Sequence, residues 1–159
     1  MKCVIMNTRV SIIRCSNYSN VKNAIKESLN LIGGLEQIVS PGDCVLLKPN
    51  VLAIRLPEDA VTTHPAVVSA MCELVSEVGG VPIIGDGSGI VKPGSTTTSQ
   101  AFKVSGMEDV ASRYGVELIN FHPNTNTATL GISYEDFEKF LKWRKNKFCY
   151  VDINCKVVF

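Results

Sequence analysis

Residues 44–50 read CVLLKPN, an unbroken apolar run that ends in a lysine, a proline and an asparagine. Four apolar residues in succession are typical of a strand covered on both faces, as in the centre of a parallel sheet. The preceding residues, Ser40–Asp43, have the composition of a turn. We therefore predict a central strand over Cys44–Leu47.

Strand-like and helix-like segments alternate on both sides of this run. Short β-rich segments predict three further strands, at Val10–Arg14, Val81–Ile84 and Val116–Phe121. Apolar residues three or four positions apart predict helices over residues 21–32, 66–78 and 107–114. Successive strand–helix units pair in parallel through right-handed crossovers. The sequence thus predicts an α/β fold: a mainly parallel sheet flanked by helices, Rossmann-like in arrangement. Pro82 has no N–H, so its strand should begin at the second or third residue.

A length of 159 residues is that of one domain, and 45% apolar residues suffice for a core. We predict a single α/β domain over residues 1–159. Its core is 10–121, and 125–159 forms a divergent C-terminal segment with a helix-like pattern around Phe137 and a final extended run. The chain stops in apolar sequence, as a shortened domain would.

Charge and cysteine usage narrow the partners and the compartment. The net charge is +1, which provides no general attraction for nucleic acid or an anionic membrane. The six cysteines occur singly, never as Cys-x-x-Cys, which favours reduced thiols in a cytoplasmic protein. No apolar run approaches the length of a membrane span, and the N-terminus is too polar for a signal peptide.

Ligands of parallel α/β sheets bind at the carboxyl ends of the strands, and three polar groups fall there. In the first, Pro49 holds Lys48 extended at a strand tip, with its ammonium group directed to an anion. Asn50 can donate and accept hydrogen bonds. A surface lysine followed by a turn asparagine is the simpler interpretation of these residues.

The second group is Thr62-Thr63-His64-Pro65, at the start of a predicted helix. Pro65 suits the first helical position, so His64 or Thr63 should be the N-cap. The following amides would then face an anion at the positive end of the helix dipole. His64 titrates near neutrality, which makes it a candidate for acid–base or metal chemistry, although a helix cap is the commoner role.

The third group is Gly85-Asp86-Gly87-Ser88-Gly89, directly after VPII. Its glycines permit close approach of the backbone to a ligand, and Asp86 stands where a carboxylate could bind a metal or a hydroxyl. The spacing is neither Gly-x-Gly-x-x-Gly nor that of a Walker loop, so a nicotinamide cofactor and nucleotide hydrolysis are unsupported. A flexible loop is the alternative.

Four stretches occur in a characteristic order: VLLKPNVL, TTHPAVVSAMCELVSEVGG, VPIIGDGSG and GMEDVASRYGVELINF. In this order and at these distances they resemble the Domain of Unknown Function 362 family, over about residues 10–121. Many members of that family carry ferredoxin-like cysteine clusters, so the resemblance implies an association with iron–sulfur proteins. This chain departs from the pattern.

The chain has no Cys-x-x-Cys-x-x-Cys run, so a ferredoxin-type cluster is not expected within it. The family's further strand and Lys-x-His segment are not recognisable after Thr127. We therefore expect an N-terminal part of such a domain. A shortened domain keeps an uncovered sheet edge and apolar face, which predicts a homo-oligomer.

Three functions fit these features. The first is an enzyme acting on a small anionic metabolite, with or without a divalent metal. The second is a non-catalytic binding module, or a docking protein for an iron–sulfur redox partner. The third is a shortened family member without activity of its own. The predicted site residues are His64 and Lys48 as catalytic groups, Asn50, Thr63, Gly87 and Ser88 as substrate-binding groups, and Asp86 as metal ligand.

Overall fold

The computed structural model describes residues 9–88, 97–121 and 150–153. Within them, one sheet has the order β3-β2-β1-β4, and all its neighbouring strands are parallel. The strands are β1 (Cys44–Pro49), β2 (Val81–Asp86), β3 (Leu118–Asn120) and β4 (Tyr150–Ile153). The predicted α/β fold with a parallel sheet is confirmed.

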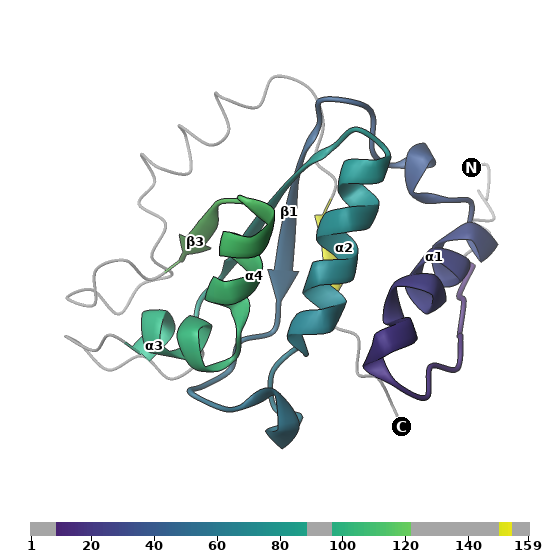
Figure 1. Ribbon diagram of the computed structural model, residues 1–159. Coiled ribbons are helices and arrows are strands. Elements are labelled where there is room, and N and C mark those ends of the chain that lie inside the picture. Colours follow the sequence, from purple (N-terminus) through teal and green to yellow (C-terminus); the bar gives the residue numbers. More distant parts are fainter. Residues whose placement is uncertain (1–8, 89–96, 122–149, 154–159) are drawn as a thin grey trace, which may run out of the picture.

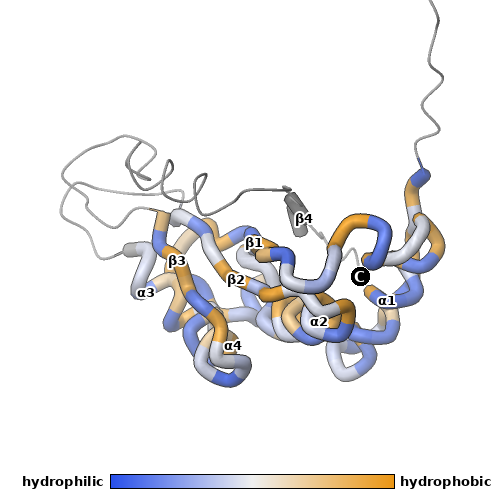
Figure 2. The backbone as a smooth tube through the Cα atoms, turned by 90° about the horizontal axis from the view of Figure 1, so that it is seen from above, coloured by the Kyte–Doolittle hydropathy of each residue, from blue (hydrophilic) through white to orange (hydrophobic). Residues whose placement is uncertain are grey.

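The helices pack against one face of this sheet. The α-helices are α1 (Val21–Leu31), α2 (Pro65–Glu77), α3 (Thr97–Val104) and α4 (Met107–Tyr114) (Figure 1). Single 3₁₀ turns occur at η1 (Tyr18–Asn20), η2 (Leu35–Gln37) and η3 (Pro57–Asp59). Figure 2, in which the strands are seen nearly end-on, places α1, α2 and α4 together on one side. In the described ranges no helix lies on the other side.

Helix α2 is the centre of the core. It contacts β1, β2, α1 and α4, and seven of its thirteen residues are buried. In β1, Val45 and Leu47 are fully buried, whereas Cys44 and Leu46 on the alternate positions are half-buried. The central place of the CVLL strand is therefore confirmed, but its second face is less covered than a continuous apolar run predicts.

Polar side chains join the three helices across their outer surface. The Lys22 ammonium on α1 pairs with Glu73 and Glu77 on α2, and Lys26 pairs with Glu77. The Tyr114 hydroxyl on α4 donates to Glu73. Hydrogen bonds from Lys22, then Tyr114, hold the pKa of Glu73 below its ordinary value. These groups are 37–55% exposed at the ion pairs, so each pair adds little stability.

The strand predicted at Val10–Arg14 is absent. The segment does not join the sheet, and the Ser11 hydroxyl lies 2.6 Å from the Ser28 hydroxyl of α1. Val10 and Ile12 are 81% and 89% exposed. β-branched residues favour a pleated surface only where a neighbouring strand is available, and α1 offers none.

Pro82 lies inside β2, which begins at Val81 and not at the second or third residue of the segment as expected. The Val81 N–H donates toward β1, to Asp43, and the Ile84 N–H donates toward β3, to Glu117. Donors alternate along a strand, so position 82 would face β3. Pairing with β3 starts only at Ile84, and the missing N–H therefore costs no ladder bond.

The segment predicted as divergent, 125–159, lies mostly outside the described residues, including the helix-like pattern around Phe137. Its final extended run contributes β4, which pairs with β1 through Leu46↔Tyr150 to Pro49↔Ile153. The predicted strand Val116–Phe121 is shorter than expected, as β3 covers Leu118–Asn120.

Gly85 permits the close packing of β2 beneath Phe121. A Cβ atom at position 85 would lie 2.8 Å from Phe121 Cε1 and 3.1 Å from Leu46 Cδ1. We expect Gly85→Ala to lower the free energy of unfolding by about 1–3 kcal/mol, as overpacking does. In a Phe121→Ala background the loss should be smaller, measured by urea denaturation of all four proteins. Equal losses in both backgrounds would contradict this packing.

Candidate functional site

The tips of β1 and β2 bring Lys48 and Asp86 together. The two strands are parallel neighbours, so their carboxyl ends lie at the same edge of the sheet. Lys48 Nζ lies 3.0 Å from Asp86 Oδ1, and the two side chains are 33% and 5% exposed. A nearly buried carboxylate thus holds a partly exposed ammonium group at the edge where ligands of α/β sheets bind.

Both carboxylate oxygens of Asp86 are engaged by the protein. Oδ2 accepts a hydrogen bond from the Val51 amide at 2.6 Å, and Oδ1 faces Lys48. In the ranges that the structure describes, no group of three or more His, Cys, Asp or Glu residues could hold a metal ion. Asp86 as a metal ligand stays a prediction.

Asn50 ties the loop after β1 to the start of α2. Its amide donates to Thr63 Oγ1 at 2.9 Å, and its carbonyl accepts from the Thr63 amide at 2.8 Å. Its side-chain Nδ2 donates to the Val61 carbonyl at 3.2 Å. Two predicted substrate-binding residues are thus adjacent, and the Thr63 hydroxyl serves as an acceptor within the loop.

His64 is the N-cap of α2, one of the two positions predicted from Pro65. Its Nδ1 accepts from the Ala66 amide at 3.1 Å, and its carbonyl accepts from the Val67 amide at 3.0 Å. Both amides that we expected to face an anion are therefore bonded to His64. The expected anion site on these amides is wrong, because the cap occupies them.

The His64 ring stacks on Tyr18 of η1, with ring centroids 3.5 Å apart and planes within 7°. Burial lowers the pKa of His64, while the Glu58 carboxylate opposes this shift. A neutral imidazole whose Nδ1 accepts a hydrogen bond must carry its proton on Nε2. In this arrangement the His64 Nε2–H can donate a hydrogen bond, whereas Nδ1 is already occupied by the Ala66 amide.

Ser88 is held inside the loop that follows β2. Its hydroxyl donates to the Leu52 carbonyl at 3.1 Å, and its amide donates to Thr98 Oγ1 at 3.2 Å. The residue is fully buried, whereas Gly87 before it is half-buried. Ser88 therefore joins the loops after β1 and β2 and, in this arrangement, offers no exposed hydroxyl to a ligand.

Buried polar side chains concentrate at this edge. In the described part of the chain six polar or charged residues are buried, and all but Ser105 lie at the end of β2, in these loops or at the start of α3: Thr62, Thr63, Asp86, Ser88 and Thr98. Thr62 was not among the residues predicted for the site. Its sequence neighbours suggested the loop, but burial of the hydroxyl is a tertiary property that no local pattern reveals.

The strand order adds a topological argument. The chain moves outward from β1 to β2 and β3, then returns to place β4 on the other side of β1. This is the order of the first four strands in doubly wound sheets, in which ligands bind where the order reverses. The reversal lies between β1 and β4, directly beside Lys48, whose register partner is Asp152.

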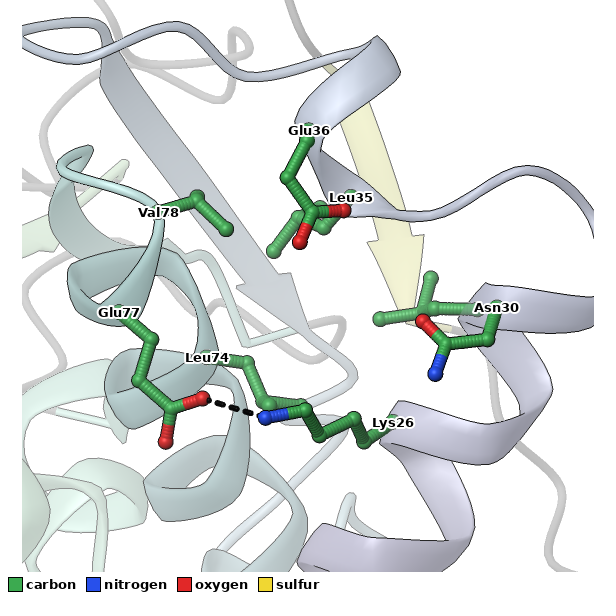
Figure 3. A pocket seen from close by; sticks show the side chains of 8 residues that line it. Lys26, Asn30, Leu35, Glu36, Leu74, Glu77 and Val78 are labelled. Atoms are coloured by element: carbon green, nitrogen blue, oxygen red, sulfur yellow. Dashed lines mark hydrogen bonds and ion pairs between the residues drawn. The ribbon is translucent and has the colours of Figure 1, made fainter.

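A separate hollow of about 170 Å³ lies at the other end of α2. Its floor is apolar, with Leu35, Leu74 and Val78, and Lys26 and Glu77 pair across its rim (Figure 3). None of the predicted site residues lines it. The hollow and the strand-tip site are therefore distinct features of the molecule.

Residues 45–145 match the sequence profile of the family described as "Domain of unknown function (DUF362)". That span is more than half of the chain. The chain belongs to this family. The match starts at residue 45, and not at 10, and it extends to residue 145, within the segment 125–159 that we expected to be divergent. It includes Lys48, His64 and Asp86.

A thylakoid-associated protein of Synechocystis sp. is 40% identical to this chain over 79 residues. The aligned part is 48% of this chain and 25% of that protein, so the chain matches about a quarter of the length of its curated relative. No solved structure matches the chain.

Two further predictions concern cysteines and membranes. Cys15, Cys44 and Cys72 are free thiols, and the other three cysteines lie outside the described residues. Burial raises the pKa of Cys72 to about 11, so this thiol stays protonated. Among the described helices, none combines the length and the apolar character that crossing a bilayer requires.

Removal of the Asp86 carboxylate should destabilise the fold. Asp86→Ala leaves the Val51 amide without its acceptor and Lys48 without this partner, and an unsatisfied buried group costs about 1–3 kcal/mol. The matched control is Glu77→Ala, which removes an exposed carboxylate and should cost about 1 kcal/mol or less. Urea denaturation measures both, and equal losses would show that Asp86 has no special structural role.

His64 should make stability depend on pH near neutrality. Because its pKa is lowered in the folded chain, the unfolded chain binds the proton first, and stability falls as pH drops below the ordinary histidine value of about 6.5. His64→Asn keeps a good N-cap that does not titrate. Its free energy of unfolding, measured from pH 5 to 8, should vary less than that of wild type. Parallel curves for the two proteins would refute this role.

Proposed function

We propose that the carboxyl edge of β1 and β2 binds a small anionic ligand, as the binding region of an enzyme acting on a small anionic metabolite. The observation that carries this proposal is the Lys48–Asp86 pair, a cationic group oriented by a nearly buried carboxylate beside the reversal in strand order. The matched segment is only a quarter of the relative's length. An enzymatic activity of this chain is therefore a proposal and does not follow from that similarity.

The proposed site consists of one charged group and the residues that position it. Lys48 supplies the positive charge, and it remains partly exposed while Asp86 restrains its position. Asn50 and Thr63 fix the loop that borders it, through two mutual hydrogen bonds. In the enzymatic role, the His64 Nε2–H donates a hydrogen bond to a ligand oxygen, and proton transfer from His64, which requires the imidazolium form, stays a prediction.

Several roles that the sequence suggests stay predictions within this proposal. Ser88 and Gly87 border the site and would contact a ligand only after the loop rearranges. A divalent metal, with Asp86 as a ligand, would need further ligands beyond the described residues.

A homo-oligomer and a cytoplasmic location are likewise proposed from sequence, whereas the relative's name associates that protein with thylakoids. Size-exclusion chromatography and cell fractionation test these two points.

Lys48→Met tests the proposal with inorganic phosphate and malonate as probes. Wild type should bind at least one of them in isothermal titration calorimetry at constant ionic strength. Loss of a charged hydrogen-bond donor should weaken binding about tenfold or more. Lys48→Arg keeps the charge and should retain most of the affinity.

Lys26→Met is the matched control for that experiment. Lys26 pairs with Glu77 at 3.0 Å, the same separation as in the Lys48–Asp86 pair, but at the other end of α2. The Lys26→Met variant removes the same net charge and leaves the strand tips unchanged. Equal weakening by both variants would reduce the effect to overall charge, and absence of binding by wild type would refute the proposal.

A further inference from the structure

Thr62 is exceptional among the buried polar residues. Thr63, Asp86, Ser88, Thr98 and Ser105 all make side-chain hydrogen bonds within the described structure. Thr62 is only 7% exposed, yet its Oγ1 is fully enclosed and has no hydrogen-bond partner among the described residues. A buried hydroxyl without a partner is costly, and in native proteins such groups call for a specific explanation.

The position of Thr62 is fixed by its two neighbours. The Val61 carbonyl accepts from Asn50 Nδ2, and Thr63 exchanges two hydrogen bonds with the Asn50 backbone. Three bonds thus clamp residues 61 and 63 to Asn50, which lies two positions after Lys48. The orphan hydroxyl is therefore held at the tip of β1 and cannot easily turn elsewhere for a partner.

The charges around this position favour an anion. Lys48 lies at the same strand tip, and α2 begins three residues after Thr62 with the positive end of its dipole. Among the carboxylates of this region, Asp86 is already bonded to Lys48 and Val51, while Glu58 of η3 acts electrostatically on His64. A hydroxyl in such a field serves best as a donor to a negatively charged oxygen.

We propose that Thr62 is a ligand-contacting residue, whose hydroxyl donates a hydrogen bond to an oxygen of the anion that Lys48 attracts. The inference rests on the proposed function and adds a specific residue to it. The ligand class is an oxyanion, a phosphate or a carboxylate. Because the Thr62 hydroxyl is enclosed in this arrangement, the loop must shift for an acceptor oxygen to reach it, as it must for Ser88. Binding of the ligand satisfies the Thr62 hydroxyl, which finds no partner among the described residues.

Thr62→Val is the decisive variant, because valine has the same shape and lacks the hydroxyl. Removing an unsatisfied group of this kind should leave the melting temperature unchanged or raise it, while affinity for inorganic phosphate or malonate falls about tenfold. Thr62→Ser keeps the hydroxyl and should bind nearly as wild type does. In the control Thr63→Val, the Asn50 amide loses its acceptor and the melting temperature should fall.

The outcomes separate this inference from the proposed function. Weaker binding by Thr62→Val with an unchanged or raised melting temperature, together with a shift of the Thr62 methyl resonance of wild type on adding the probe, supports the contact. Unchanged affinity of Thr62→Val, alongside weakened Lys48→Met, overturns the Thr62 contact and leaves the anion site standing; a buried water then satisfies the hydroxyl. No binding by wild type overturns both.

Discussion

The buried carboxylate of Asp86 holds the tips of the two central strands in place. It comes from the last residue of β2, and its partners come from β1 and the residue that follows Asn50: the Lys48 ammonium group and the Val51 amide. A carboxylate with so little exposure is costly to bury unless it is paired and hydrogen-bonded. The path of the chain after β1 is therefore set by Asp86, and the Asn50–Thr63 bonds carry that constraint on to the start of α2.

Helix α2 links this edge to the rest of the core. Its first turn is capped by His64, which also stacks on Tyr18, and its buried face packs on β1 and β2. Its outer face is joined to α1 and α4 through Glu73. One helix thus connects the strand-tip loops to the N-terminal elements, while the ion pairs on its exposed surface contribute orientation more than stability.

Much of this arrangement could be predicted from local patterns. The CVLL run, the alternating helices and the glycine stops indicate parallel strands, and parallel neighbours necessarily place Lys48 and Asp86 at one edge. Pro65 likewise indicates a cap at His64 or Thr63. These inferences succeed because each depends on backbone geometry within a few residues, together with one rule of connection.

The predictions that the structure contradicts failed for a different reason: each depended on tertiary contacts. Val10–Arg14 has the composition of a strand, but pairing needs a neighbour that composition cannot supply, and the segment lies against α1 instead. The amides of Ala66 and Val67 are occupied because the cap is a histidine whose ring and carbonyl both fold back on the helix. Thr62 was missed because the absence of a partner exists only once the loop has been folded around it.

The separation of Asp86 from its partners along the chain has a kinetic consequence. Val51 and Asp86 are 35 positions apart, with the whole of α2 between them. Closing a loop of that length costs conformational entropy before the contact stabilises the chain, whereas α2 can form from local contacts. The strand tips therefore come together after the helix, as β2 docks on β1. During synthesis, a nascent chain acquires this edge only when residue 86 has emerged, and every shorter intermediate lacks the Asp86 carboxylate that pairs with Lys48.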